Sequence, residues 1–148
     1  MSIRCWDWQR NKLESPSTVF RGFTNIPLCI DVDPNSMQLI MGCKGCDGSS
    51  LYLWDTRNNS APKAQFDEHE QDIVSCFFIS AQTAISASKD NVILIWDLVS
   101  MDILCKYYLN MGSSCTSMSL CCRRFSVTSL KGEIMNFEIS PTFQISVL

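Results

Sequence analysis

The sequence predicts an all-β chain of repeated four-stranded antiparallel sheets, the blades of an open or partial β-propeller. Two observations predict it. Four apolar stretches end in an aromatic residue followed by an acid, and we interpret these pairs as closing a blade: Trp6-Asp7, Trp54-Asp55, Trp96-Asp97 and, in weaker form, Phe137-Glu138. The four aromatic residues are 48, 42 and 41 residues apart. A period of roughly 40–45 residues is typical of one propeller blade.

This period divides the 148 residues into about three and a half blades. We expect one partial propeller over residues 1–148, with these parts: the outer two strands of an incomplete blade at 1–22, a blade at 23–67, a blade at 68–109 and a degenerate blade at 110–148. A closed ring needs about 4–8 blades. We therefore expect a fragment or isoform of a longer propeller. The alternatives are an incomplete gene model and a ring that a second copy completes.

Short apolar runs separated by turn signals predict the individual strands. The first full blade has a tight turn at residues 33–36, where Pro34 and Asn35 favour a reversal of the chain. Its predicted strands cover 26–32, 37–43, 51–54 and 63–66. The next blade has predicted strands at 73–79, 83–87, 92–96 and 103–109, and the last outer strand is predicted at 143–148. Almost no helix is expected.

Composition excludes several classes of protein. The chain is 46% hydrophobic and 18% charged, so it can bury a core and is not intrinsically disordered. Its net charge of −3 and the lack of a basic block argue against nucleic-acid binding. No apolar run approaches the roughly 18–20 residues of a membrane span. Arg4, Asp7 and Arg10 interrupt the region where a secretory signal would be apolar. We expect an intracellular protein, cytoplasmic or in the nucleus or cilium, whose nine cysteines are reduced.

Four side chains in the blade at 68–109 have the spacing of a hydrogen-bond relay: His69, Ser86, Asp90 and Trp96. This pattern, with the Trp-Asp period, resembles the WD40-repeat family over the full length of the chain. In that family the His enters the innermost strand and the Asp lies in the turn between the second and third strands. A buried imidazole and a buried indole each need a partner, which such a relay supplies. We therefore expect His69 to be structural, with a ligand or catalytic role as the alternative.

The other repeats have the same order of predicted strands but lack the full set of relay residues. Gly22-Phe23 stands where a Gly-His pair would be, and Met41 replaces the Ser, while Asp47 and Trp54 remain. The order of the repeats, with a Trp-Asp repeat, a repeat that carries the Gly-rich, Cys-bearing insert at 42–48 and degenerate end blades, resembles the C-terminal half of a WD repeat-containing protein 31-like protein. There too such an insert precedes a Leu-Trp-Asp strand.

Two further clusters are candidate sites. The acidic stretch at 67–72 holds Asp67, Glu68, Glu70 and Asp72, which could attract a basic peptide at the rim of a propeller. Its other interpretation is a solvated loop. Cys43 and Cys46 form a CxxC pair, but zinc would need two more ligands and a redox pair normally begins a helix. We expect a loop there, with a metal or redox site as a remote alternative.

The function implied by the WD40 resemblance is a non-catalytic scaffold or adaptor that binds other proteins. No nucleophile–base pair, Gly-rich phosphate loop or recognisable carboxylate pair points to catalysis, so no cofactor or metal is expected. The alternative is a peptide-recognition module that uses the acidic stretch at 67–72. Further blades or a second copy are the other expected partners, and neither nucleic acid nor membrane insertion is.

Overall fold

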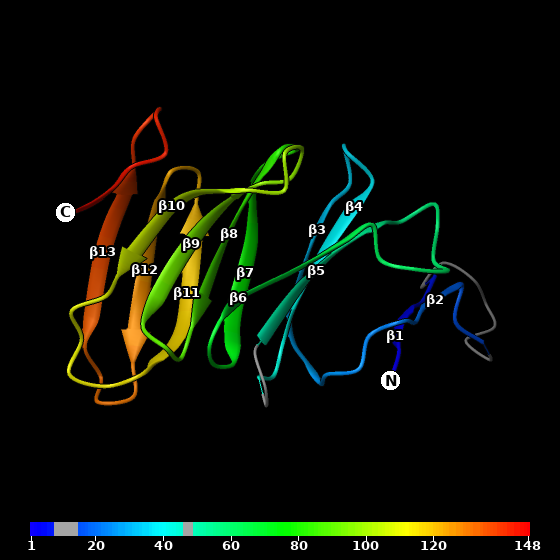
Figure 1. Ribbon diagram of the computed structural model, residues 1–148, viewed down its shortest axis with the longest axis horizontal. Helices are drawn as coiled ribbons and strands as arrows, with labels where there is room; N and C mark the ends of the chain where they lie inside the picture. The colour runs from blue at the N-terminus through cyan, green and yellow to red at the C-terminus, as the bar shows by residue number, and fades with distance from the viewer. Residues whose placement is uncertain (8–14, 46–48) are drawn as a thin grey trace.

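The computed structural model describes residues 1–7, 15–45 and 49–148, and these residues form an all-β structure (Figure 1). They contain one two-stranded sheet and three four-stranded sheets, all antiparallel, and no helix. The described residues therefore contain no helix that is long and apolar enough to cross a membrane. The predicted fold class is confirmed.

Each four-stranded sheet is a meander, in which strands that follow one another along the chain are hydrogen-bonded neighbours. The small sheet consists of β1 (Ile3–Cys5) and β2 (Thr18–Phe20). The next sheet consists of β3 (Pro27–Asp33), β4 (Gln38–Cys43), β5 (Ser49–Asp55) and β6 (Ala64–His69). The third consists of β7 (Ile73–Ser80), β8 (Thr83–Ser88), β9 (Val92–Asp97) and β10 (Ile103–Tyr108). The last consists of β11 (Cys115–Cys121), β12 (Arg124–Ser129), β13 (Ile134–Ile139) and β14 (Ile145–Val147).

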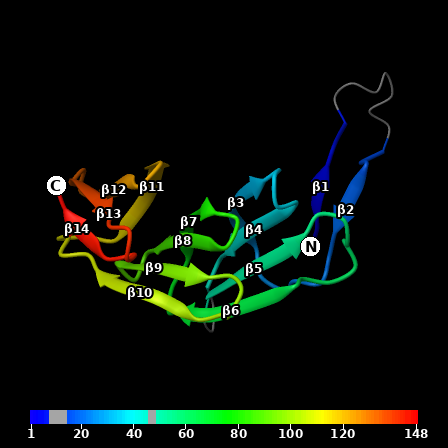
Figure 2. The same ribbon diagram turned by 90° about the horizontal axis from the view of Figure 1, so that it is seen from above.

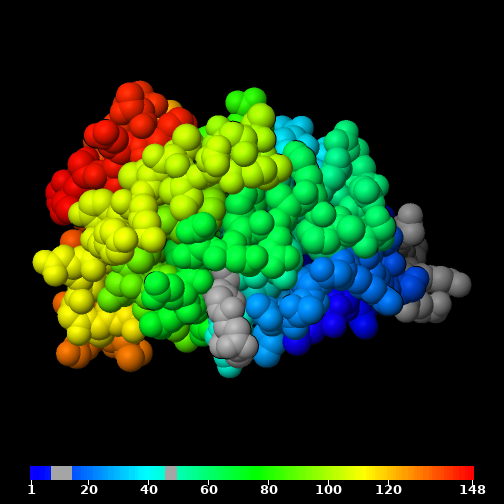
Figure 3. Space-filling model, in the orientation of Figure 1, coloured from blue at the N-terminus to red at the C-terminus, as the bar shows by residue number. Residues whose placement is uncertain are grey.

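The sheets are stacked face to face in chain order and form an open arc. Figure 2 shows the first strands of the full sheets, β3, β7 and β11, along one side, with β6 and β10 along the opposite side. We call these the inner and outer strands. Figure 3 shows that neighbouring sheets meet in a continuous surface from the N-terminal to the C-terminal sheet. The described sheets do not close into a ring.

Three apolar clusters hold the stack together. The cluster between the β3–β6 and β7–β10 sheets is built on Ile40, Leu51, Leu53, Ile73, Leu94 and Trp96. The cluster between the β7–β10 and β11–β14 sheets is built on Ile85, Ile93, Ile95, Val127 and Phe137. The third lies under β1 and β2 and is built on Phe20, Phe23, Leu39, Met41, Tyr52 and Trp54. Alternating side chains of one sheet thus enter two different interfaces, as the pleat of a strand requires.

Small side chains let the inner parts of two sheets come close. A Cβ on Gly42 of β4 would lie 2.5 Å from Cγ2 of Ile73 and 2.6 Å from Sγ of Cys29. The Sγ atoms of Cys29 in β3 and Cys76 in β7 are 3.4 Å apart. Close approach of these sheets therefore depends on a glycine and two thiols.

One strand differs from the sequence prediction in a way that affects the site. The outer strand predicted at 63–66 is β6, Ala64–His69, which continues to the backbone pairing of Ser49 with His69 after a register shift. Asp67 and Glu68 are exposed on this edge strand, where polar side chains are tolerated. His69 therefore ends an outer strand of one sheet instead of entering the inner strand of the next, because β7 begins only at Ile73.

Candidate functional site

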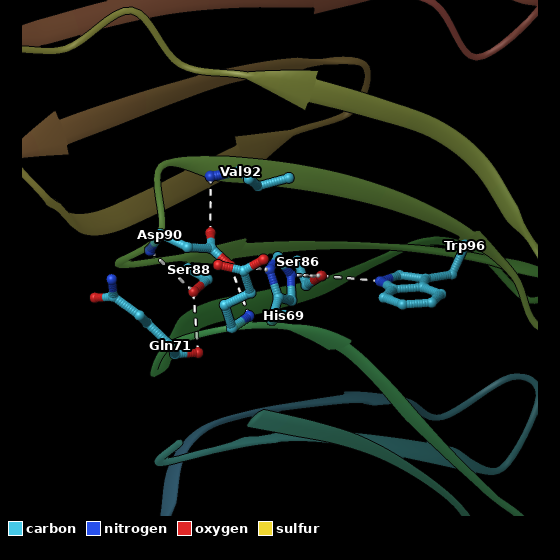
Figure 4. Close-up of polar contacts among 8 residues, drawn as sticks. His69, Gln71, Ser86, Ser88, Asp90, Val92 and Trp96 are labelled. Carbon is cyan, nitrogen blue, oxygen red and sulfur yellow. Dashed lines mark hydrogen bonds and ion pairs between the residues drawn. The ribbon is translucent and has the colours of Figure 1, made fainter. Parts of the chain in front are cut away.

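Three hydrogen bonds connect His69, Ser86, Asp90 and Trp96 into one relay (Figure 4). His69 Nε2 lies 2.8 Å from Ser86 Oγ, and His69 Nδ1 lies 3.1 Å from Asp90 Oδ2. The indole Nε1 of Trp96 donates to the same Ser86 oxygen at 2.8 Å. The structure thus brings together all four residues that the spacing singled out. His69 supplies the link from the outer strand of the preceding sheet.

The strand register explains why Ser86 is the centre of this relay. Trp96 of β9 pairs with Ala84 of β8, so Ser86 lies two residues further along the same face of the sheet. Its hydroxyl accepts a hydrogen from Trp96 and can donate its own to His69 Nε2. With a hydrogen on Nδ1, His69 then donates to Asp90, and every polar side-chain atom of this relay has a partner.

Asp90 joins this relay to the turn between β8 and β9. Its carboxylate accepts hydrogen bonds from the backbone N–H groups of Val92, at 2.8 Å, and Glu70, at 3.0 Å, besides the bond from His69. Burial opposes ionisation of this carboxyl, but the hydrogen bond from His69 and those from the two backbone donors keep its pKa below the usual value. Asp90 therefore fastens the 69–70 connection to the turn.

Ser88 and Asn91 complete this corner, and the sequence analysis did not single them out. Ser88 Oγ donates to the carbonyl of Gln71 at 3.0 Å and accepts from the Asp90 N–H at 3.2 Å. Asn91 adopts a φ of 62° and accepts from the Cys115 N–H at 2.7 Å, which ties the turn to the β11–β14 sheet. Asn after Asp in a tight turn was the available signal, because Asn tolerates the left-handed region.

The relay is poorly placed for chemistry on a ligand. His69 is 2% exposed and Ser86 is 0% exposed, and both ring nitrogens of His69 already face protein partners. The part of the chain that the structure describes contains no group of three or more His, Cys, Asp or Glu residues that could hold a metal ion. What the arrangement can do is hold a strand end, a turn and an indole in one geometry.

The acids of two Trp-Asp pairs also serve the turns that follow them. Asp97 Oδ1 accepts from the N–H groups of Val99, at 2.8 Å, and Ser100, at 3.2 Å. Asp55 accepts from the side chain and backbone N–H of Arg57, and these bonds lower the pKa of Asp55 to about 2. Trp54 and Trp96 are buried, whereas Trp6, beside Asp7, is 46% exposed.

The second repeat has the closing indole without the relay. Met41 and Phe23 are buried beside Trp54 in one apolar cluster, and the Phe23 ring centroid lies 6.2 Å from that of Tyr52. The Trp54 Nε1 has no hydrogen-bond partner among the described residues. Asp47, the expected turn acid, lies outside the described residues.

The four acids of the 67–72 stretch do not face a common point. Asp67 accepts hydrogen bonds from Ser50 and Gln65, whereas Asp72 pairs with Lys89 at 2.8 Å. The hydrogen bond from Lys89 lowers the pKa of Asp72. Glu70 is exposed, and its backbone N–H is bonded to Asp90.

Asp67 and Glu68 do line a cleft of about 510 Å³. β6 forms one wall with residues 65–68, and the end of β9 and the start of β10 form the other with Trp96, Met101, Asp102 and Ile103. Three carboxylates therefore meet apolar side chains at this place. Met101 and Asp102 were not predicted to take part, because no local sequence signal places the β9–β10 connection beside β6.

Of the predicted Cys43 and Cys46 pair, the structure describes Cys43, and Cys46 lies outside the described residues. Cys43 is buried, and burial together with the nearby Cys29 raises the pKa of Cys43 to about 12. A thiol with so high a pKa is a poor metal ligand or nucleophile at neutral pH, because both roles need the thiolate.

Comparison with known proteins identifies the segment that carries the relay. Residues 60–97 match the family described as WD domain, G-beta repeat. These residues are therefore similar to a WD40 repeat. The match contains the end of β6 with His69, the turn with Asp90 and the strand that ends at Trp96-Asp97.

Two curated proteins resemble a longer part of the chain. The peroxisomal targeting signal 2 receptor of Mus musculus is 31% identical over 99 residues, which are 64% of this chain and 30% of the receptor. Protein transport protein SEC31 of Pyricularia oryzae is 28% identical over 98 residues, which are 64% of this chain and 8% of that protein. The chain therefore spans less than a third of the length of these relatives.

Two solved structures share the fold. The C-terminal WD40 domain of Sif2 superposes with a TM-score of 0.74 over 85% of this chain and 35% of that structure, at 19% identity. The β-propeller domain of Cps50 (Swd1) from Myceliophteria thermophila superposes with a TM-score of 0.68 over 85% of this chain and 38% of that structure, at 16% identity. The four-stranded sheets that the structure describes therefore have the fold of β-propeller blades.

Proposed function

We propose that this chain is a non-catalytic scaffold or adaptor that binds other proteins inside the cell, as part of a longer propeller. The observation that carries the proposal is the use of the polar motif residues inside the fold. His69, Ser86 and Trp96 are buried and hydrogen-bonded to one another, so they stabilise a blade and leave its surfaces to partners.

The relatives are compatible with this role. One is named a receptor for a targeting signal and the other a protein transport protein. Since the chain matches only part of each, we propose the general role of protein binding and leave out their particular partners. The narrower resemblance to WD repeat-containing protein 31 stays a prediction, because the curated relatives that match are other proteins.

The experiment is affinity capture with the tagged chain in a cell extract, with cross-linking and mass spectrometry to map the contacts. Each captured protein is then purified, and its binding to the purified chain is measured by calorimetry. We expect at least one direct partner, cross-linked to exposed side chains of the blades. A chain that binds no purified candidate, or that turns over a substrate at a site built from described residues, would contradict the proposal.

A second candidate function is recognition of a basic peptide in the cleft between β6 and the β9–β10 connection. The specific observation is the placement of Asp67, Glu68 and Asp102 around apolar side chains in one cleft. An Arg or Lys side chain could lay its methylene stem on the apolar wall and place its charge among the carboxylates. Glu70 and Asp72, which also belong to the predicted acidic rim, do not line this cleft.

A fluorescein-labelled nonapeptide of alternating arginine and glycine tests this candidate by fluorescence anisotropy. We expect saturable binding that weakens as salt rises, because exposed charges are screened. Glu68→Lys should weaken binding at least tenfold, whereas the matched control Glu70→Lys should change it less than twofold. Equal effects of the two reversals would show that the peptide senses only net charge, and the candidate would be rejected.

A further inference from the structure

Two thiols face each other where the inner strands of the two central sheets meet. Cys29 of β3 and Cys76 of β7 are free cysteines, and their Sγ atoms are 3.4 Å apart. A disulfide bond is about 2 Å long, so the two sulfur atoms would have to approach by about 1.4 Å to form one. Both strands belong to complete four-stranded sheets, so the pair lies between two blades and not at an end of the stack.

The two sulfur atoms differ in their access to solvent. Cys76 is 1% exposed, whereas Cys29 is partly exposed. Gly42 leaves the space that the Cys29 thiol occupies, because a Cβ on this glycine would lie 2.6 Å from the Cys29 Sγ. A small molecule can therefore reach Cys29, while its partner is enclosed between the sheets.

The pair also differs in acidity. A hydrogen bond from Cys76 lowers the pKa of Cys29. The same hydrogen bond, together with burial, raises the pKa of Cys76. Burial raises the pKa of Cys43 to about 12 and that of Cys115 to about 11. Of these four thiols, Cys29 loses its proton most readily, and the thiolate is the form of cysteine that oxidants attack.

We propose that Cys29 and Cys76 form a redox-sensitive site, at which a peroxide converts the two thiols into a reversible disulfide between neighbouring blades. The Cys29 thiolate attacks one oxygen of the peroxide, an S–O bond forms and the O–O bond breaks. The departing hydroxide takes up a proton and leaves as water, and Cys29 becomes a sulfenic acid. The proposal does not depend on the scaffold function.

The second step joins the two blades. The Cys76 sulfur attacks the Cys29 sulfur, so the S–S bond forms and the S–O bond breaks. The hydroxide that leaves Cys29 takes the proton of the Cys76 thiol and forms a second water. The two thiols together lose two electrons, which reduce one hydrogen peroxide to two waters. The product holds β3 and β7 together by a covalent bond at the inner side of the stack.

Peptide mass spectrometry of the purified chain tests the proposal. The chain is treated with hydrogen peroxide, its remaining thiols are alkylated, and it is digested without reduction by trypsin and Asp-N. Asp-N cuts before Asp31 and so separates Cys29 from Cys43. We expect residues 22–30 joined to residues 72–89, lighter by two hydrogens than the sum of the two peptides. Dithiothreitol should abolish this joined peptide by thiol–disulfide exchange.

Two variants assign the roles of the thiols. Cys76→Ser should abolish the joined peptide and leave a sulfenic acid on Cys29, which dimedone labels. Cys29→Ser should abolish the joined peptide and leave Cys76 without this label. The matched control, Cys121→Ser with Cys122→Ser, removes two exposed thiols and should leave the yield of the joined peptide unchanged. Far-UV circular dichroism confirms that each variant is folded.

The wild-type digest decides the proposal even where a variant fails to fold. The proposal is overturned if peroxide oxidises Cys121 and Cys122 and no joined peptide appears. A bond from Cys29 to Cys43, or a bond from Cys29 to Cys76 that forms only between two chains on a non-reducing gel, would also overturn it. Loss of the joined peptide in the control variant would have the same meaning.

Discussion

Trp54 and Trp96 occupy equivalent positions in neighbouring sheets, yet of these two indoles only that of Trp96 has a hydrogen-bond acceptor among the described residues. Trp54 of β5 pairs with Leu39, and Trp96 of β9 pairs with Ala84. Two residues beyond the paired residue, one strand has Met41 and the other has Ser86. The Ser86 oxygen accepts the Trp96 N–H at 2.8 Å, whereas the buried Trp54 N–H has no partner among the described residues. Equivalent positions therefore differ in their energetics.

This contrast predicts different costs for the same substitution. Trp96→Phe removes a hydrogen bond and leaves Ser86 without one of its partners, whereas Trp54→Phe removes an N–H group for which the described part of the chain supplies no acceptor. We expect Trp96→Phe to reduce the free energy of unfolding by about 1–2 kcal/mol more than Trp54→Phe, the worth of a buried hydrogen bond. Urea denaturation followed by far-UV circular dichroism measures both. Equal losses would contradict the role given to Ser86.

His69→Ala should destabilise the chain by about 1–3 kcal/mol, because it leaves Ser86 and Asp90 with unsatisfied buried atoms. It also detaches the end of β6 from the next sheet. The exposed neighbour substitution Glu68→Ala is the control and should change stability by less than about 0.5 kcal/mol. Thermal unfolding of both variants is the measurement. An unchanged melting temperature for His69→Ala would show that the relay is not needed for stability.

Gly42→Ala should weaken the contact between the β3–β6 and β7–β10 sheets. The added Cβ would lie 2.5 Å from Ile73 Cγ2 and 2.6 Å from Cys29 Sγ, so both neighbours must move. Overpacking of this kind costs about 1–3 kcal/mol. Gly112→Ala is the control, because its nearest neighbour, 3.3 Å away, is the end of the flexible Glu133 side chain. Denaturant unfolding should separate the two variants, and similar values would refute the close approach.

The lowered pKa of Asp90 predicts part of the pH dependence of the free energy of unfolding. Its pKa is lower in the folded chain than in the unfolded chain, so the unfolded chain binds more protons as the pH falls. The stabilisation is therefore fully present above the unfolded pKa of about 4 and is lost as the pH falls through the folded value. Asp90→Asn should be less stable than wild type at pH 7, and this difference should shrink below about pH 4. Asp102→Asn, an exposed carboxylate on the cleft, is the control for loss of charge.

Urea denaturation of the two variants at several pH values gives these differences. A gap between wild type and Asp90→Asn that stays constant from neutral to acidic pH would contradict an ionised Asp90 in the folded chain.

Local sequence signals predicted the fold well because each strand carries its own information. Three of the predicted endings, at Trp54, Trp96 and Phe137, lie in β5, β9 and β13, and the turn at 33–36 joins β3 to β4, whereas Trp6-Asp7 follows the end of β1. The partners of His69 could be named from spacing, because Ser86 and Asp90 belong to one hairpin. The length of β6 could not, because Asp67 and Glu68 are weak strand formers that lie at the register shift between the Leu51–Phe66 and Ser49–His69 pairs.

Features formed between sheets were not predictable from one sequence. The contact of Cys29 with Cys76 joins residues of different blades, and the same holds for Gly42 against Ile73. The alternating apolar residues of β3 predict an ordinary core strand. Only the placement of β1 and β2 shows that one face of β3 is partly exposed. The acidic cleft likewise needs the β9–β10 connection beside β6.

The close approach at Gly42 also sets a geometric property of the stack. Near their inner strands the two central sheets are separated by a glycine and two thiols, whereas further out they are held apart by Phe66 and Trp96, whose ring centroids are 4.9 Å apart. Small side chains on one side and large rings on the other make this interface a wedge. The volumes of these few residues therefore set the angle between the two central sheets, and a change at either side would alter that angle.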